Sequence, residues 1–323
     1  MIERTDPLAP RLANGGLMVL DGGLATELER RGADLRDDLW SARLLVDDPT
    51  MIREVHEAYL AAGADLIATA SYQASLEGFA RRGLSEEDAR GLIRRSAALA
   101  RSAREKITGQ GGGVAGRLEP LVAGSVGPYG AALADGSEYR GHYGATSGGL
   151  EAFHRPRLEE LVAGGVDLIQ LETFPSIDEA LLVLDLLRRW PGMVAMVSFS
   201  TRDEAHVSEG PAIEDAVRAV ASMENAVAVG VNCLPPARVD PLLARMVRAT
   251  DLPLVVYPNS GEEWDAERKC WVGEAAGFDP ETDGTRWYRA GARLVGGCCR
   301  TTPATIRRLA ELVARGVSLE ESR

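Results

Sequence analysis

Histidine is scarce in this chain, which contains four histidines among 323 residues. These residues, His56, His142, His154 and His206, form neither a His-x-His nor a His-Glu-x-x-His pair. Closely spaced histidines of that kind are typical zinc ligands of metal-dependent hydrolases. Their absence argues against a zinc hydrolase of the usual barrel type.

Positive charge is also in short supply. The chain has 36 lysines and arginines against 48 aspartates and glutamates, which gives a net charge of -12 at pH 7. Nucleic acids and anionic membrane surfaces require clustered positive charge on a protein that binds them. We therefore expect no nucleic acid partner and no membrane partner, and small-molecule substrates instead.

Long apolar segments are lacking as well. No apolar run approaches the length of a membrane span, and the charged segment Met1 to Pro7 has no apolar core of a signal peptide. We therefore expect a cytoplasmic protein. In a reducing cytosol, four cysteines that include an adjacent pair are more typical of metal ligands or reactive thiols than of a disulfide framework.

Short apolar, β-branched segments alternate with helical patterns along the whole chain, which is typical of βα units around a parallel sheet. We predict eight strands at residues 17–20, 66–70, 121–126, 168–171, 194–199, 227–231, 254–257 and 293–295. We predict eight helices at residues 49–62, 85–106, 150–163, 177–190, 213–223, 236–249, 284–290 and 303–315. Since no linker marks a second domain, the sequence predicts a single α/β domain over residues 1–323, a (β/α)8 TIM barrel.

The connections after strands are long, whereas those before strands are short. In a barrel this asymmetry places the elaborated loops at the carboxyl ends of the strands, where active sites of this fold lie. Polar residues at those ends are therefore candidate site residues. Those we select are Asp21, Tyr72, Ser125, Glu172 and Asn232, together with Cys233, Cys298 and Cys299.

Cys233, Cys298 and Cys299 follow the sixth and eighth predicted strands, which only one strand separates. Catalytic zinc sites typically have three protein ligands and an open fourth position. The spacing thus favours a catalytic zinc site, with a redox-active vicinal pair and simple core packing as alternatives. Cys270 lies in a charged segment that we predict to be a loop, and we leave it out of the site.

Six segments give the chain a resemblance to a known family: residues 21–32, 69–74, 123–131, 135–141, 256–262 and 291–303. On these motifs it resembles the homocysteine S-methyltransferases, of the bacterial and plant type that uses S-methylmethionine. The resemblance implies a β/α barrel with Zn2+ bound by the three named cysteines and homocysteine sulfur in the open position. It also implies that Asp21 and Glu172 face the amino group of homocysteine, and that donors near Ser125 and Asn232 orient its backbone end.

The chemistry implied by the resemblance is methyl transfer from a sulfonium donor to a thiolate, which produces methionine. The leaving group is a neutral thioether, so no general acid is required. An aromatic face attracts a cation by about 0.5 to 2 kcal/mol, which makes Tyr72 and Trp40 candidates for the donor site, with core packing as an equal alternative for Trp40. Polar partners for the amino and carboxylate groups of the donor are expected in the loop after the third strand, at Ser137, Glu138, Tyr139 and Arg140.

Three alternatives stay open. A betaine-dependent homocysteine methyltransferase has the same fold, and a zinc- and thiol-binding redox sensor would need no turnover. A folate-dependent methionine synthase fits less well, because one barrel occupies all 323 residues. Within the family type, the sequence favours S-methylmethionine as donor, with S-adenosylmethionine also considered, and it leaves the oligomeric state open.

Overall fold

The computed structural model describes residues 6–35, 39–109, 118–265 and 270–316, with the backbone alone at residues 263–265, 270 and 271. Its main sheet has eight parallel strands in the order β1-β10-β7-β6-β5-β4-β3-β2. Their bounds are β1 (Met18–Val19), β2 (Leu66–Ala68), β3 (Leu121–Val126), β4 (Leu168–Phe174), β5 (Ala195–Phe199), β6 (Ala226–Asn232), β7 (Leu254–Tyr257) and β10 (Ala292–Val295). A parallel bridge between Leu20 and Leu66 joins the two outer strands and closes the sheet into a barrel.

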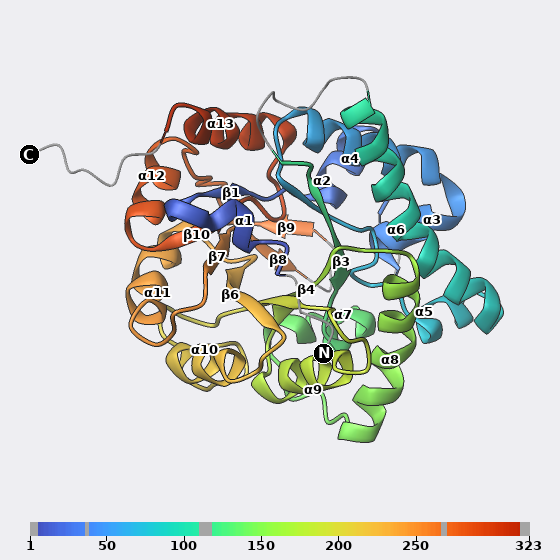
Figure 1. Cartoon of the computed structure of the whole chain (residues 1–323). Helices are drawn as coiled ribbons and strands as arrows, with labels where there is room; N and C mark the ends of the chain where they lie inside the picture. The colour runs from blue at the N-terminus through green and yellow to red at the C-terminus, as the bar shows by residue number, and fades with distance from the viewer. Residues whose placement is uncertain (1–5, 36–38, 110–117, 266–269, 317–323) are drawn as a thin grey trace, which may run out of the picture.

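The longer helices surround the strands, as Figure 1 shows. They are α4 (Pro49–Ala61), α6 (Glu86–Gly109), α8 (Ser147–Ala163), α9 (Ile177–Leu187), α10 (Ile213–Ala221), α11 (Val239–Met246), α12 (Thr282–Arg289) and α13 (Pro303–Ala314). Each overlaps one of the eight predicted helices. The predicted (β/α)8 fold is therefore confirmed, with helix ends displaced by a few residues.

Shorter helices, 3-10 turns and a hairpin lie before β1 and in the segments that connect the barrel elements. The short helices are α1 (Ala9–Leu12), α2 (Leu24–Arg30), α3 (Leu44–Asp47), α5 (Leu76–Ala80) and α7 (Tyr129–Leu133). The 3-10 turns are η1 (Ala13–Gly15), η2 (Trp40–Arg43), η3 (Ser137–Tyr139) and η4 (Pro236–Arg238). The segment predicted as a loop around Cys270 instead contains an antiparallel hairpin of β8 (Glu263–Asp265) and β9 (Cys270–Val272). Strands of three residues with charged neighbours give no clear periodic pattern in a sequence.

The apolar core has two parts. Inside the barrel, inward-facing residues such as Met196 and Leu294 pack together with Leu8 from the segment before β1. Outside it, the other faces of the strands pack against the surrounding helices, with Leu171 and Phe174 of β4 among the buried residues. This division follows from the alternation of side chains along a strand and leaves the carboxyl ends of the strands free to carry polar groups.

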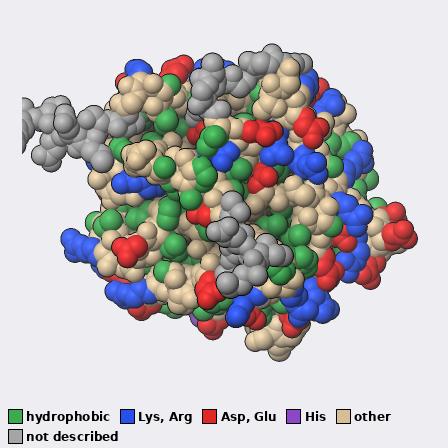
Figure 2. Space-filling model, in the orientation of Figure 1, with side chains coloured by type: hydrophobic (Ala, Val, Ile, Leu, Met, Phe, Trp, Pro, Cys, Tyr) green, Lys and Arg blue, Asp and Glu red, His purple; other side chains and the backbone are tan. Residues whose placement is uncertain are grey.

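Charged side chains of both signs are interspersed over the face drawn in Figure 2. On α6, for example, Arg90 and Arg94 pair with Glu160 of α8. Among the helices that the structure describes, none is long and apolar enough to cross a bilayer.

Candidate metal centre and substrate cavity

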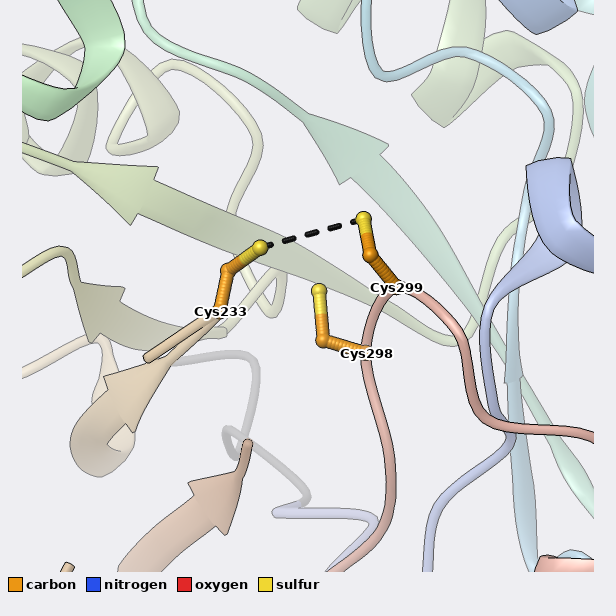
Figure 3. Close-up of side chains that lie close together, drawn as sticks. All are labelled: Cys233, Cys298 and Cys299. Carbon is orange, nitrogen blue, oxygen red and sulfur yellow. Dashed lines mark hydrogen bonds between the residues drawn. The ribbon is translucent and has the colours of Figure 1, made fainter. Parts of the chain in front are cut away.

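The sulfurs of Cys233, Cys298 and Cys299 converge at the carboxyl ends of the strands, where their Sγ atoms all lie within 4.8 Å of one another. Cys233 directly follows β6, and the adjacent pair lies in the segment after β10. The Sγ atoms of Cys233 and Cys299 are 3.8 Å apart, and Figure 3 shows the three side chains pointing toward a common centre. The predicted cluster of three cysteines is therefore present.

The backbone around the cysteines is held by β7. The Cys233 amide donates a hydrogen bond to the Tyr257 carbonyl at 3.1 Å, and the Cys298 amide donates to the Pro258 carbonyl at 2.8 Å. Gly297, just before the adjacent pair, must be small, because a Cβ atom there would lie 2.3 Å from Thr301 Oγ1. These contacts fix the two cysteine-bearing segments on either side of one strand end.

The electrostatics of the three sulfurs fit a divalent metal. Hydrogen bonds from Cys298 and Cys299 hold the pKa of Cys233 well below its ordinary value. The pKa values of Cys298 and Cys299 are raised well above their ordinary values, because each acts as donor to the Cys233 thiolate and both are partly shielded from solvent. A bound cation would offset the repulsion among three thiolates, and thiolates are preferred ligands of zinc.

A cavity opens beside the sulfurs and carries two carboxylates, of which Asp21 is buried and Glu172 is half-buried. Asp21, just after β1, is 7% exposed, and its Oδ2 accepts a hydrogen bond of 2.9 Å from the Ala68 amide. Glu172 of β4 accepts hydrogen bonds from the Ser125 hydroxyl and, at 3.3 Å, from Gln170 Nε2. Burial raises the pKa of Glu172 to about 7 and raises that of Asp21 well above its ordinary value. Both acids would be stabilised as carboxylates by a cationic ligand group.

A bulge in β4 explains how Glu172 reaches the cavity together with its neighbour. The pairing of β4 with β5 shifts between Leu171 and Phe174, and Thr173 has a positive φ of 61°. The extra residue keeps Leu171 and Phe174 in the outer core, while Glu172 and Thr173 both line the cavity. The strand is thus longer than predicted, and Glu172 lies within it rather than after it.

Seven of the eight predicted site residues line the cavity: Asp21, Tyr72, Ser125, Glu172, Cys233, Cys298 and Cys299. Asn232 instead lies in the wall behind it. Its Oδ1 accepts a hydrogen bond of 2.7 Å from the Thr173 amide, and its Nδ2 donates to Thr173 Oγ1 at 2.9 Å. The same Nδ2 lies 4.0 Å from Cys298 Sγ. The structure therefore gives Asn232 partners that stabilise the bulge of β4.

The loop predicted to receive the methyl donor divides between cavity and surface. Glu138 and Tyr139 line the cavity, and the Tyr139 hydroxyl lies 3.2 Å from Cys233 Sγ. Ser137 hydrogen-bonds Asp135 through its hydroxyl, and the exposed Arg140 pairs with the same aspartate at 3.4 Å. Trp40 also lines the cavity and packs against the outer core.

Residues that the sequence analysis did not select also shape the site. Gln170 lines the cavity, and its Nε2 donates to the Tyr257 hydroxyl at 3.2 Å. The sequence could have identified Gln170 as a cavity residue, because Gln170 and Glu172 are two residues apart in a strand and so share a face. Arg157 of α8 is buried and donates hydrogen bonds to the carbonyls of Tyr72 at 2.7 Å and Gly127 at 2.8 Å. An arginine in a helix gives no sequence signal for such a contact.

Comparison with known proteins identifies the family to which this chain belongs. The family model for homocysteine S-methyltransferase matches residues 18–313. The chain belongs to the homocysteine S-methyltransferase family. It is 47% identical over 314 residues to the homocysteine S-methyltransferase of Escherichia coli, covering 95% of this chain and 99% of that protein. It is 44% identical over 305 residues to the homocysteine S-methyltransferase YbgG of Bacillus subtilis, covering 94% and 97% of the two chains.

A solved structure supports membership of the homocysteine S-methyltransferase family. The metallated form of the homocysteine methyltransferase MmuM from Escherichia coli superposes with a TM-score of 0.82 and 45% sequence identity. The match covers 95% of this chain and 99% of that one. The barrel and the family resemblance expected from the sequence are both confirmed.

Proposed function

We propose that this protein transfers a methyl group from a sulfonium donor to the sulfur of L-homocysteine, producing methionine. The observation that carries the proposal is the convergence of three cysteine sulfurs on a cavity that also holds the buried Asp21 and the half-buried Glu172. Thiolate ligands suit a metal that binds a thiol substrate, and buried acids suit an amino acid substrate. Family membership supports the same reaction.

We assign zinc as the metal, with Cys233, Cys298 and Cys299 as its ligands. Bound there, zinc would supply the positive charge that keeps the substrate thiol in its nucleophilic thiolate form at neutral pH. We further propose that the protein works in the cytoplasm as one barrel domain over residues 1–323, on small-molecule substrates and without nucleic acid or membrane partners.

The residues of the chain bind and orient the acceptor. Asp21 and Glu172 receive the ammonium group of homocysteine, which stabilises both as carboxylates. Ser125 orients Glu172 through the hydrogen bond from its hydroxyl to Oε1, and Asn232 holds Thr173 beside it. Positioning of the reacting sulfur and methyl group is the main contribution expected of the protein, because orientation supplies several kcal/mol.

No proton transfer to the leaving group is required, since a sulfonium that loses a methyl group leaves as a neutral thioether. The cavity is lined by Tyr72 and Trp40, whose aromatic faces attract the donor cation by about 0.5 to 2 kcal/mol. We propose S-methylmethionine as the preferred donor, so that one S-methylmethionine and one homocysteine give two methionines. Betaine lacks an amino group and would leave acceptors in the cavity without partners.

The test is methionine formation from homocysteine with S-methylmethionine, S-adenosylmethionine or betaine as donor. We expect the highest kcat/KM with S-methylmethionine, and loss of activity when zinc is removed by a chelator and not restored. A preference for betaine would contradict the assignment of the donor. Binding of homocysteine and zinc without turnover of any donor would favour the alternative of a thiol-binding redox sensor.

A further inference from the structure

A second group of hydrogen-bond acceptors lies in the cavity, apart from Asp21 and Glu172. Glu138 in η3 is 7% exposed and lines the cavity, and its Oε2 has no hydrogen-bond partner among the described residues. Within the same described part, the side-chain oxygen of Gln73 is also buried without a partner. Buried acceptors that lack a donor are costly. These two acceptors therefore indicate a ligand group that donates hydrogen bonds through N–H or O–H.

Both residues that carry these acceptors line the cavity and also contact α7. Gln73 Nε2 donates to the Ala131 carbonyl at 3.0 Å, which leaves the side-chain oxygen facing elsewhere. The backbone of Glu138 packs against Gly130, where a Cβ atom would lie 2.8 Å from the Glu138 nitrogen. Asp21 and Glu172, by contrast, contact β2 and β3 through Ala68 and Ser125.

Both acceptor groups lie near the sulfurs. Tyr139, the neighbour of Glu138, has its hydroxyl 3.2 Å from Cys233 Sγ. Cys233 acts electrostatically on Glu138 as well as on Glu172. Burial raises the pKa of Glu138 to about 7. A reaction between two amino acids at one sulfur centre needs two such ammonium sites.

We propose that Glu138 and Gln73 bind the α-ammonium group of the methyl donor, an inference that rests on the proposed function. An ammonium group has three N–H donors, whereas a sulfonium centre and the quaternary ammonium of betaine have none. Unpartnered acceptors therefore select donors that are α-amino acids. The aromatic faces of Tyr72 and Trp40 remain for the sulfonium centre of the same molecule.

The experiment is calorimetric binding of S-methylmethionine and of dimethylsulfoniopropionate, which carries a sulfonium but no ammonium, to the zinc-loaded protein. Glu138→Gln keeps the shape of the side chain and removes its charge. We expect this variant to bind S-methylmethionine about 10- to 100-fold more weakly, as for loss of a hydrogen bond to a charged group. Binding of dimethylsulfoniopropionate and of homocysteine should stay unchanged.

Glu87→Gln is the matched control, because it makes the same change of charge at an exposed position of α6, outside the cavity. We expect it to bind all three ligands as the wild type does. If Glu138→Gln does not fold, Gln73→Met is the second variant, with a smaller loss confined to S-methylmethionine. Equal losses for the two sulfonium compounds, an unchanged affinity, or no binding of S-methylmethionine to the wild type would overturn the inference.

These measurements need no turnover, so they separate the inference from the proposed function. A wild type that binds S-methylmethionine through Glu138 but transfers no methyl group would contradict the proposed function alone. If the Glu138→Gln variant forms methionine from S-methylmethionine as well as the wild type does, the inference alone is contradicted.

Discussion

Glu172 shows how one side chain acquires its chemistry from the residues around it. Two neighbours, Ser125 and Gln170, donate hydrogen bonds to its two oxygens and fix its orientation. Its burial raises its pKa to about 7, so that a carboxyl that would normally be ionised far below neutrality titrates near it. Its charge, and with it the attraction for an ammonium group, therefore depends on pH.

The pH dependence of ligand binding follows from this shift. A raised carboxyl pKa means that the ionised form, which attracts an ammonium, increases as pH rises through about 7. We expect the affinity for methionine, which has the ammonium but no thiol, to rise from about pH 6 to about pH 8 and then level off. Burial also raises the pKa of Asp21, with a further contribution from Glu172, so the ionised form of Asp21 increases with pH as well. Cys233 contributes electrostatically to the raised pKa of Glu172.

Calorimetric titration of methionine into the wild type and Glu172→Gln across this pH range checks the expectation. The variant should bind methionine more weakly at pH 8 and should show a smaller change with pH. An affinity that does not change with pH in the wild type, or an equal slope in the two proteins, would mean that Glu172 does not carry the ammonium.

At the scale of single residues, the sequence identifies candidate site residues better than it identifies their hydrogen-bond partners. The three cysteines, Asp21 and Glu172 could be selected because strand ends of a barrel meet at one mouth. The partners of Asn232 could not, since they depend on a bulge in β4 that gives Thr173 a left-handed conformation. The unpartnered oxygen of Glu138 is likewise a property of packing in three dimensions.

At the scale of elements, periodic patterns predicted all eight strands of the barrel and the helices around it. Long helices and buried strands repeat their apolar residues often enough to be recognised. The sequence analysis missed the hairpin of β8 and β9 and the turn η3. Each of these three elements has only three residues, which is too short for a periodic pattern. The missed turn contains Glu138 and Tyr139, so an element of three residues contributes two residues of the cavity wall.

Strand β6 contains a glycine that the barrel requires. A Cβ atom on Gly230 would lie 1.8 Å from the Val255 carbonyl oxygen of β7, and backbone cannot move there without disturbing both strands. We expect Gly230→Ala to destabilise the protein by about 2 to 4 kcal/mol, since overpacking at fixed backbone is costly. Urea unfolding followed by circular dichroism measures the change.

Gly91 is the matched control for this substitution. It lies exposed in α6, and a Cβ atom there would meet no atom within 4 Å. Gly91→Ala should stabilise the protein by about 0.5 to 1 kcal/mol, because alanine favours a helix over glycine. Equal stability of Gly230→Ala and the wild type would show that β6 and β7 can separate more easily than the structure indicates.

At the scale of the whole molecule, closure of the barrel is what assembles the site. The bridge between Leu20 and Leu66 joins the first strands of the sheet and brings Asp21 to within a hydrogen bond of Ala68. The neighbouring positions of β6, β7 and β10 bring Cys233 to Cys298 and Cys299. The same closure could be anticipated from the alternation of strands and helices, whereas the family resemblance supplied the identity of the substrates.

The claim on which the whole account depends is that the three cysteines hold zinc. The most direct test is the zinc content of purified protein, measured by elemental analysis for the wild type, Cys270→Ser and the double variant Cys298→Ser/Cys299→Ser. We expect about one zinc per chain in the wild type and in Cys270→Ser, because a catalytic site takes three protein ligands and we assign that role to the other three cysteines. The double variant should lose its zinc while keeping the circular dichroism spectrum of the folded barrel. Full zinc occupancy in the folded double variant would contradict the account.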